Sequence, residues 1–359
     1  MSNIAKIQEL VRTSEIDALL LTSYTNRRYT LGFSSSAGVA VIAPENAWFF
    51  VDSRYIEAAR EVIPDAEVAL MDLDNPYEKL INTVCAGEKI SRLGFESDRL
   101  TYAEFERFKD KLNAELVSAP EVMSAARAVK SREELAKMIA AQRIAEDAFS
   151  SVLPVISTDI TERQLATELI CALLRAGAED VSFPPIVVSG ANSSKPHGVP
   201  GDTKISEGFL TIDFGAKKDG WCSDTTRTVC VGKATDEMKK VYNTVLEAQL
   251  AGIATVRAGV LGSDVHGAAH EIISKAGYGE YFGHGFGHGL GLEVHEAPSA
   301  SPSYQKPLPA GAVISAEPGI YLPGRFGVRI EDVLYVTENG CENITNLPKE
   351  LIELKAVQL

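Results

Sequence analysis

The sequence is poor in cysteine and has no long hydrophobic run. Its five cysteines are odd in number and show no C-x-x-C spacing, which excludes a disulfide framework and a thiolate zinc site. They are Cys85, Cys171, Cys222, Cys230 and Cys341. No stretch approaches the roughly 20 apolar residues of a membrane span, and the first segment, MSNIAKIQELV, lacks the apolar core of a signal peptide. We therefore expect reduced thiols, a cytoplasmic location and no membrane partner.

Positive charge is also scarce. The chain has 35 Lys and Arg against 49 Asp and Glu, which gives a formal net charge of −14. Nucleic acids and anionic membranes bind clustered basic residues, so neither is expected as a partner. The hydrophobic content of 45% and the charged content of 23% are ordinary for a soluble globular protein. A length of 359 residues is long for one core and indicates two domains.

Residues 1–127 alternate helix-like and strand-like patterns. Helical patterns cover residues 4–11, 53–62 and 102–112, and short β-rich runs cover residues 18–21, 38–43 and 48–51. This alternation predicts a compact α/β domain. The segment contains no glycine-rich phosphate loop and no recognisable catalytic set, so it indicates a fold class without indicating a chemistry.

Residues 128–359 are predicted to form a second, α+β domain. Ser131 and Glu134 form an S-x-x-E capping box that begins a long helix, and Thr161 and Gln164 offer a second box. Further helical patterns cover residues 236–256 and 263–275, and strand patterns cover residues 186–189, 209–215, 221–231, 312–317 and 328–337. We expect a mostly antiparallel sheet with helices packed on one face.

Two aspartates lie on either side of a predicted β-hairpin. The segment is TIDFGAKKDGWCSDTTRTVCVG, in which β-rich runs flank a turn at residues 217–220. Pairing that is symmetric about this turn would place Asp213 directly across from Asp224. Both side chains would then project from one face of the hairpin, with Cβ atoms roughly 5 Å apart.

A second hairpin repeats the arrangement with glutamates. In AVISAEPGIYLPGRFGVRIEDVLYV, a Pro/Gly turn joins two strands and brings Glu317 opposite Glu331, with the midpoint at Gly324. Like charges placed directly across a ladder destabilise it, so a chain that does this twice is expected to hold something cationic between them. The pattern therefore predicts a metal site, and it hints at an internal duplication.

The candidate ligands are four carboxylates and one imidazole: Asp213, Asp224, His288, Glu317 and Glu331. An oxygen-rich set with one nitrogen suits Mn²⁺, Co²⁺, Fe²⁺ or Zn²⁺. The carboxylates carry four negative charges, which two divalent ions balance and one ion does not. Two ions roughly 3.5–4 Å apart, bridged by carboxylates and a hydroxide, form a hydrolytic centre. Glu317 is our candidate for accepting the proton of the attacking hydroxide.

His288 lies in a glycine-rich run that also contains His284 and His295. The run is YFGHGFGHGLGLEVHEAP. His284 and His288 are four residues apart, but the alternate glycines make a helix improbable, since each costs up to about 1 kcal/mol relative to alanine. We expect the glycines to let the backbone approach an ion or a substrate closely. A dinucleotide-binding loop is excluded because the G-x-G-x-x-G spacing is absent.

Three other histidines are weaker candidates. His266 and His270 are four residues apart in GSDVHGAAHEI, but the HExxH order is not met and no third ligand is apparent. We expect them to lie on a polar helix face. His197 stands in the Pro/Gly/Ser-rich segment SSKPHGVPGD, just before the first hairpin. A lone loop histidine is more often structural than catalytic.

Taken together, these motifs resemble those of the pita-bread metallopeptidases. They are DFG at Asp213, DTTRT at Asp224, the HGFGHGLGLEVHEAP run from His284, EPGIY at Glu317 and GVRIED around Glu331. More narrowly, they are similar to the Xaa-Pro peptidase branch, which holds aminopeptidase P and prolidase. With the two aspartate elements counted as one motif, four separate motifs in the right order make this resemblance specific.

The resemblance covers about residues 125–359, and it extends to the first domain. There NRRYTLGFSSSAGV and FVDSRY resemble the creatinase-type domain that precedes the catalytic domain in this branch. The implied fold is an α/β creatinase-like N-terminal domain over residues 1–127, followed by an α+β pita-bread catalytic domain over residues 128–359. The resemblance also suggests a homodimer.

The resemblance implies a role for each metal ligand. Asp213 would chelate one ion, while Asp224 and Glu331 would bridge both ions. His288 and Glu317 would complete the coordination of the other ion. Two divalent ions are therefore the implied cofactors, with Mn²⁺ expected and Co²⁺ or Zn²⁺ as alternatives.

It also implies roles for residues that do not bind metal. His197 would contact the scissile amide nitrogen, His295 would contact the substrate carbonyl, and His284 would line the pocket near the leaving proline. Strand alternation places Thr226 on the same face as the aspartate two residues before it, and Arg329 on the same face as the glutamate two residues after it. Both could therefore orient the ligands from behind.

The implied reaction is hydrolysis of the bond between an N-terminal residue and a following proline, so the expected partners are peptides with proline in second position. In some dipeptidases of this branch, an arginine after the HExP element captures the carboxylate of a dipeptide. Here HEAP is followed by Ser299, which favours an Xaa-Pro aminopeptidase over an Xaa-Pro dipeptidase (prolidase). Arg325 or Arg329 could still supply that charge, so the dipeptidase remains the alternative.

Three further alternatives are disfavoured. A metal-free, creatinase-like hydrolase and a peptide-binding pseudo-enzyme would both be expected to lack ligands, and this chain has all five. A methionine aminopeptidase would share the ligands but usually lacks the first domain.

Overall fold

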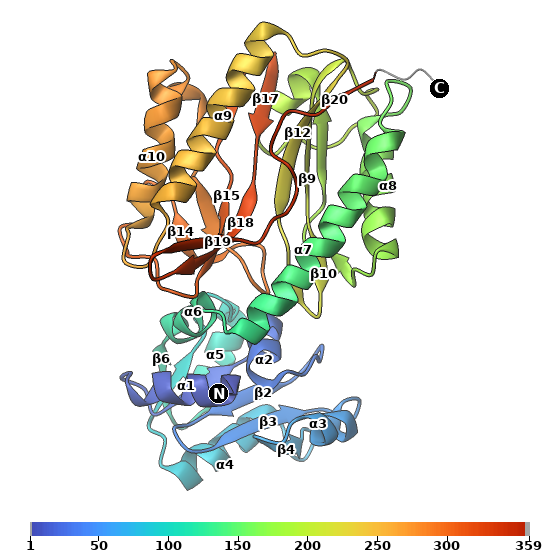
Figure 1. Cartoon of the computed structure of the whole chain (residues 1–359). Coiled ribbons are helices and arrows are strands. Elements are labelled where there is room, and N and C mark those ends of the chain that lie inside the picture. Colours follow the sequence, from blue (N-terminus) through green and yellow to red (C-terminus); the bar gives the residue numbers. More distant parts are fainter. Residues whose placement is uncertain (1, 356–359) are drawn as a thin grey trace. The chain divides into compact units, whose positions relative to one another are not determined.

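The computed structural model describes residues 2–355 and divides the chain into two compact units, Met1–Arg127 and Ala128–Leu359 (Figure 1). Each unit has its own hydrophobic core. No helix within the described residues combines the length and the apolar character needed to cross a membrane.

The N-terminal unit is an α/β domain, as predicted. Its six-stranded sheet has the order β4-β3-β2-β1-β5-β6, antiparallel between β1, β2 and β3 and parallel elsewhere. The strands are β1 (Ala18–Leu21), β2 (Val39–Ile42), β3 (Ala47–Val51), β4 (Glu67–Leu70), β5 (Arg92–Phe95) and β6 (Glu115–Ser118). The helices are α1 (Asn3–Arg12), α2 (Tyr24–Leu31), α3 (Ile56–Val62), α4 (Tyr77–Glu88), α5 (Tyr102–Lys111) and α6 (Pro120–Ala128).

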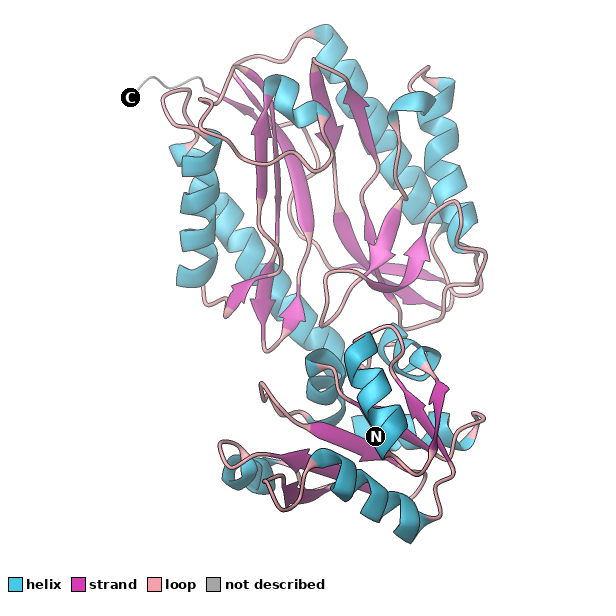
Figure 2. Ribbon diagram, turned by 180° about the vertical axis from the view of Figure 1, so that it is seen from behind, coloured by secondary structure: helices cyan, strands magenta, loops and turns pink. Residues whose placement is uncertain are grey.

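Two helix pairs frame the C-terminal unit, with α7 packed on α8 and α9 packed on α10 (Figures 1 and 2). The helices are α7 (Arg132–Val152), α8 (Glu162–Arg175), α9 (Asp236–Thr255) and α10 (Gly262–Lys275), and short 3₁₀ turns occupy Leu153–Val155, Gly190–Ser194 and Gly279–Tyr281. Both predicted capping boxes are present, Ser131 with Glu134 and Thr161 with Gln164. These caps satisfy orphan N–H groups and so fix where α7 and α8 begin.

The strands of this unit are mostly antiparallel, as predicted. They form the sheets β20-β12-β9-β8, β14-β13-β15-β18-β19, β11-β10-β7 and β16-β17, and among the described strands of this unit only β12 and β20 pair in parallel. The strands are β7 (Asp180–Val181), β8 (Ile186–Ser189), β9 (Gly208–Phe214), β10 (Ala216–Lys218), β11 (Trp221–Cys222), β12 (Thr225–Val231), β13 (Gly287–Gly289), β14 (Glu296–Ala300), β15 (Val313–Ala316), β16 (Gly319–Leu322), β17 (Phe326–Arg329), β18 (Asp332–Thr337), β19 (Gly340–Asn343) and β20 (Glu353–Leu354).

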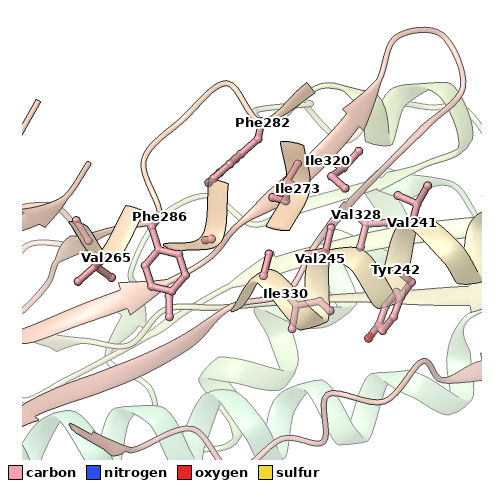
Figure 3. Close-up of a cluster of buried hydrophobic side chains, with 14 of the residues drawn as sticks. Val241, Tyr242, Val245, Val265, Ile273, Phe282, Phe286, Ile320, Val328 and Ile330 are labelled. Atoms are coloured by element: carbon pink, nitrogen blue, oxygen red, sulfur yellow. The ribbon is translucent and has the colours of Figure 1, made fainter. Parts of the chain in front are cut away.

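Each helix pair contributes its apolar face to a separate core cluster. One cluster joins α7 and α8 to β8, β9 and β12, and the other joins α9 and α10 to strands from β15 to β18. Figure 3 shows part of the second cluster, in which Val241 and Val245 of α9 lie beside Val328 and Ile330. Burial of these helix faces packs the helices against the strands next to the candidate ligands.

The first hairpin turns one residue later than predicted. Asp219 and Gly220 both have positive φ, at 51° and 82°, and they form a two-residue turn closed by the pair Lys218–Trp221. Positive φ at both central residues belongs to the type I′ turn, for which Asp-Gly is a preferred sequence. The centre of the hairpin therefore lies between Asp219 and Gly220.

Asp213 consequently lies opposite Thr226 and not opposite Asp224. The predicted pairing is wrong, because moving the centre of a hairpin by one residue moves every cross-strand pair by two. A shift of two leaves each side chain on its original face. Asp224 itself lies outside the ladder, in the short interruption between β11 and β12.

The second hairpin keeps the predicted register. The pair Ala316–Asp332 of the β15–β18 ladder and the pair Gly319–Arg329 of the β16–β17 ladder are both symmetric about residue 324. Glu317 therefore stands opposite Glu331, as predicted. The two glutamates lie in the interruption between these ladders, where neither belongs to a strand.

Candidate metal centre

The predicted site residues converge on one pocket of about 600 Å³ in the C-terminal unit. It is lined by all five candidate ligands and by the candidate catalytic histidines, together with Arg329. These residues are Asp213, Asp224, His288, Glu317, Glu331, His197, His284 and His295. Segments of β9, β13 and both hairpins thus reach one cavity, although the candidate ligands are spread over residues 213–331.

Asp224, His288 and Glu331 form the tightest group. One ligand atom from each lies within 4.8 Å of the others. The Nε2 atom of His288 is 3.5 Å from Asp224 Oδ2 and 3.2 Å from Glu317 Oε1. Asp213 lines the same pocket, but its Oδ2 atom accepts a hydrogen bond of 2.7 Å from Arg329. The sequence-predicted ligands are thus brought together, with three in the closest cluster.

The surroundings of two carboxylates in this group disfavour their ionised forms. Burial raises the pKa of Asp224 well above its usual range, and the charges of Glu331 and Asp213 raise it further. Burial also raises the pKa of Glu331 well above its usual range, with the charges of Glu317 and Asp213 adding to the effect. Asp213 shifts in the same direction, mainly through burial, although Arg329 opposes the rise in its pKa.

Glu317 differs from the other carboxylates. Burial alone would raise its pKa, but its hydrogen bond to His288 and the charge of that imidazole lower the pKa to about 2. Burial opposes protonation of His288, yet the hydrogen bond and charge of Glu317 raise the pKa of His288 overall. In the metal-free protein, ionised Glu317 and protonated His288 therefore stabilise each other.

Arg329 organises the wall of the pocket behind the carboxylates. Its guanidinium donates to Thr226 Oγ1 at 2.9 Å, to the Tyr321 hydroxyl at 2.8 Å and to the Pro196 carbonyl at 3.2 Å, besides its bond to Asp213. Thr226 in turn donates to Glu331 Oε2 at 2.8 Å. The structure therefore places Thr226 and Arg329 against the ligands, where strand alternation put them.

A second buried ion pair lies next to the ligands along the chain. The Nη2 atom of Arg227 is 2.8 Å from Asp332 Oδ1, and both side chains are almost fully buried. Arg227 also donates from Nη1 to the carbonyls of Thr226 and Glu331. It thereby ties the strand that follows Asp224 to the segment that carries Glu331.

Two of the candidate catalytic histidines face the open part of the pocket. His197 and His295 are exposed, and burial together with neighbouring His288 lowers the pKa of His295. The rings of His288 and His295 meet edge to face, with centroids 4.3 Å apart. His284 is more enclosed, and its Nε2 lies 2.9 Å from the Tyr321 hydroxyl.

The glycines around His288 serve strand packing. A Cβ atom on Gly287 would overlap the Ser315 carbonyl oxygen, and one on Gly289 would lie 2.5 Å from the Glu296 carbonyl oxygen. These glycines let β13 fit between β14 and β15, with the backbone N–H of His288 bonded to the Ser315 hydroxyl at 3.0 Å. At Gly287 and Gly289, the backbone therefore lies close to neighbouring strands, whereas we had expected it to lie close to an ion or a substrate.

Comparison with known proteins gives the family. Residues 136–338 match the model of metallopeptidase family M24, and residues 3–129 match the creatinase/prolidase N-terminal domain. The first match covers more than half of the chain. The chain belongs to metallopeptidase family M24.

Relatives of this M24 chain place it in the Xaa-Pro peptidase branch. The uncharacterized peptidase YqhT of Bacillus subtilis is 42% identical over 98% of this chain and 99% of its own length. A solved Xaa-Pro dipeptidase from Bacillus anthracis is 39% identical, with a TM-score of 0.94 over 98% of this chain and 99% of its own. A solved X-Pro aminopeptidase from Thermotoga maritima is 34% identical, with a TM-score of 0.90 over 96% of this chain and 100% of its own. The predicted fold, an N-terminal creatinase-type domain followed by a pita-bread domain, is confirmed.

The donor set of this M24 protein fits divalent metal ions. Asp213 Oδ1 and Glu331 Oε1 are buried, and neither has a hydrogen-bond partner among the described residues. Buried carboxylate oxygens without partners are costly unless a cation neutralises them. Arg329 balances one of the four negative charges of the carboxylates. The remaining negative charge is more than one monovalent cation would neutralise. Carboxylates with one imidazole are ligands that Mn²⁺, Co²⁺ and Zn²⁺ share.

Sequence reasoning missed two features of the site. Tyr321 bonds both His284 and Arg329, and strand alternation from Glu317 was the signal that could have found it. His266 was expected on a polar helix face, but it is buried at 7% exposure and stacks on Phe282. The expectation is wrong because α10 turns this histidine toward the core beneath the glycine-rich run.

Proposed function

We propose that the chain is a metal-dependent Xaa-Pro aminopeptidase, which removes the N-terminal residue from peptides with proline in second position. The observation that carries this proposal is the convergence of four carboxylates and His288 on one pocket. We propose that these five residues hold two divalent ions, with Mn²⁺ as the resident metal. Such ions, when bound, polarise a scissile carbonyl and lower the pKa of a water molecule.

The exposed histidines have the chemistry that the rest of the reaction needs. The lowered pKa of His295 leaves it neutral near pH 7, so that one ring nitrogen can donate to a carbonyl oxygen as that oxygen becomes negative. A proline nitrogen lacks an N–H in the peptide and must gain a proton as it leaves, which suits His197 at the pocket rim. Glu317 stays ionised at neutral pH, the form required to accept a proton.

His295→Ala tests the proposal that His295 donates a hydrogen bond to the substrate carbonyl oxygen. We expect a fall in kcat of roughly 10²–10³-fold, the usual effect of losing one oxyanion donor, with the metal content unchanged. Loss of metal together with unchanged turnover in the metal-replete variant would contradict the role given to His295.

The charges around the pocket support a preference for peptides longer than two residues. Arg329 is the single Lys or Arg among the described residues that line the pocket, and its guanidinium is already bonded to Asp213, Thr226, Tyr321 and Pro196. Arg325 does not line the pocket, and it pairs with Glu237. The C-terminal carboxylate of a bound dipeptide would therefore meet no uncommitted guanidinium or ammonium group. A longer peptide carries that carboxylate away from the ligands.

An Xaa-Pro dipeptidase is the second candidate. It is favoured by the likeness to the Bacillus anthracis structure, which is named an Xaa-Pro dipeptidase and has a TM-score of 0.94 to this chain. In that case the exposed histidines, His197 and His295, would have to hold the dipeptide carboxylate.

Three substrates with the same first two residues distinguish these candidates. They are an Xaa-Pro dipeptide, the same dipeptide with an amidated C-terminus, and an Xaa-Pro-Xaa tripeptide, each tested with the Mn²⁺-loaded protein. The aminopeptidase proposal expects kcat/KM to rise from the free dipeptide to its amide and to the tripeptide, because both remove the nearby carboxylate. The highest kcat/KM on the free dipeptide would overturn it. An Xaa-Ala-Xaa tripeptide is the control for proline specificity.

We further propose a cytoplasmic location. All five cysteines are free thiols, which fits a reducing compartment. The homodimer suggested by the sequence resemblance stays a prediction.

A further inference from the structure

Two glutamines lie on helix faces that are mostly apolar. Gln142 belongs to the buried face of α7, where Met138 and Ala145 are buried with it. Gln249 belongs to the buried face of α9, four residues after Val245, which is labelled in Figure 3. Both amides are at 0% exposure. An amide buried this completely needs hydrogen bonds to offset its lost hydration.

Gln249 spans the interruption in the second hairpin. Its Nε2 atom donates to the Ala316 carbonyl at 3.0 Å and to the Ile330 carbonyl at 3.2 Å. Two carbonyl acceptors fix the orientation of the amide, since the reverse orientation would put its oxygen against both of them. These two carbonyls immediately precede Glu317 and Glu331.

The peptide groups that precede the two glutamates are therefore held at both ends. The N–H of Glu317 donates to the Phe286 carbonyl at 2.7 Å, and the N–H of Glu331 donates to the Thr226 carbonyl at 3.0 Å. The C=O of each peptide group thus accepts from Gln249, and its N–H donates to a residue outside the hairpin. The plane of a peptide group limits where the next Cα–Cβ bond points. Gln249 thus helps to aim both glutamates into the pocket.

Gln142 makes the corresponding contact at the first hairpin. Its Nε2 atom donates to Thr225 Oγ1 at 2.6 Å, and that hydroxyl donates to the Asp224 carbonyl at 2.6 Å. The relay reaches the interruption between β11 and β12, where Asp224 lies. Each long helix, α7 and α9, thus places one glutamine amide at the ladder interruption in its own half of the C-terminal unit.

Both amides also carry a cost. The Oε1 atoms of Gln142 and Gln249 are buried, and neither has a hydrogen-bond partner among the described residues. An unsatisfied buried acceptor is destabilising, so an apolar side chain would serve packing alone better than glutamine does. An apolar residue could not supply the N–H donors of the amide, so these donors are the reason to expect a glutamine at each position.

We propose that Gln142 and Gln249 are positioning residues of the metal centre, which hold the two ladder interruptions in the shape that turns Asp224, Glu317 and Glu331 toward the ions. This inference rests on the proposed function, because it assumes that these carboxylates bind divalent metal. Neither glutamine lines the pocket, so neither touches substrate.

Gln249→Met tests the proposal, because methionine is unbranched, of similar length and apolar. The metal-stripped variant is titrated with Mn²⁺ by calorimetry, and its Tm is recorded. We expect Mn²⁺ to bind about 10–100-fold more weakly, the range seen when a group that orients a metal ligand is removed. At saturating Mn²⁺ we expect kcat to fall while the KM of an Xaa-Pro-Xaa peptide stays within about threefold of wild type.

Tyr242→Phe is the matched control on the same helix. It removes one partly buried hydrogen bond, from the Tyr242 hydroxyl to the Lys349 carbonyl at 2.8 Å, and neither residue lines the pocket. We expect a lower Tm with Mn²⁺ affinity and kcat unchanged. Wild-type Mn²⁺ affinity in Gln249→Met overturns the proposal, and so does an equal loss of affinity in Tyr242→Phe. A wild-type protein that binds no Mn²⁺ would instead refute the proposed function.

A second set of variants keeps the proposal testable if Gln249→Met does not fold. Gln142→Met and Thr225→Val break the same relay, so each should weaken Mn²⁺ binding to a similar degree, and the double variant should be no worse than either single one. Losses that multiply in the double variant would show that the two groups act separately. That result, or an unchanged affinity, overturns the relay.

Discussion

Asp224→Asn is expected to change stability in opposite directions with and without metal. Asp224 is 4% exposed, its pKa is raised well above the usual range by burial and by Glu331, and a carboxamide has nearly the same shape. In the metal-stripped protein at pH 7.5, the change replaces a repelled carboxylate by a neutral group whose N–H can donate to Glu331. With metal bound, it removes a ligand charge.

The size of the effect follows from the burial of the charge. Relief of one poorly compensated buried charge is worth about 1–3 kcal/mol. For a unit of this length, 1 kcal/mol shifts Tm by about 2–4 °C, so the stripped variant should melt about 2–12 °C above stripped wild type. At 1,000 times the dissociation constant, a bound ion stabilises the wild type by about 4 kcal/mol, and the variant loses most of this. With metal, the order of the two Tm values should therefore reverse.

The pH dependence provides an internal check. The folded-state pKa values of Asp224 and Glu331 lie above their unfolded values, so the stripped wild type loses stability as pH rises from the unfolded value, about 4, through the folded one. The advantage of the variant should therefore vanish near pH 4. Calorimetric scans from pH 4 to 8 measure this, with the exposed Asp202→Asn as control. A stripped variant that is less stable than stripped wild type at pH 7.5 would refute the reasoning.

Three further outcomes are expected. Arg329→Lys should lower Mn²⁺ affinity about tenfold in calorimetric titrations, because lysine cannot hold Asp213 and its other partners at once; unchanged affinity would contradict the role of the guanidinium. Lys130→Met should lower the free energy of unfolding by about 3–5 kcal/mol in urea titrations, because a buried carboxylate, Glu296, loses a buried cation at 2.8 Å, and adding Glu296→Leu should recover much of the loss. An additive double variant would count against that coupling. Burial lowers the pKa of His266 to about 4, so unfolding should draw protons between pH 6.5 and 4, and His266→Phe should remove up to about 3 kcal/mol of acid-induced destabilisation; equal acid sensitivity of both proteins would exclude His266 as its source.

The candidate site was predictable because its residues obey strand rules. Alternation and turn symmetry were enough to bring Glu317 opposite Glu331 and to put Thr226 and Arg329 against the ligands. The predicted pairing of Asp213 was wrong because the turn can be centred in two ways. A four-residue turn over residues 217–220 and a two-residue Asp-Gly turn have centres that differ by one position. Sequence patterning alone does not choose between them.

Other features depend on tertiary packing that no local pattern encodes. The ladders are interrupted at Asp224 and Glu331, which lie within predicted strands, and at Glu317, where a predicted strand ends. At Glu317 and Glu331 the backbone N–H groups bond instead to the Phe286 and Thr226 carbonyls, and the preceding carbonyls bond to the amide of Gln249. Gln249 shows the same limit, since a glutamine on an apolar face gives no sign of the two carbonyls it meets.

The Arg227 contacts bear on the order in which the molecule assembles. Arg227 and Thr226 come from the strand that follows Asp224, yet they bond the backbone on both sides of Glu331, which belongs to the other half of the unit. Neither half alone presents the complete set of oxygens. We therefore expect a nascent chain to capture its ions only after both halves have docked, so that metal loading would be a late event in biosynthesis and fragments ending before residue 331 would remain empty.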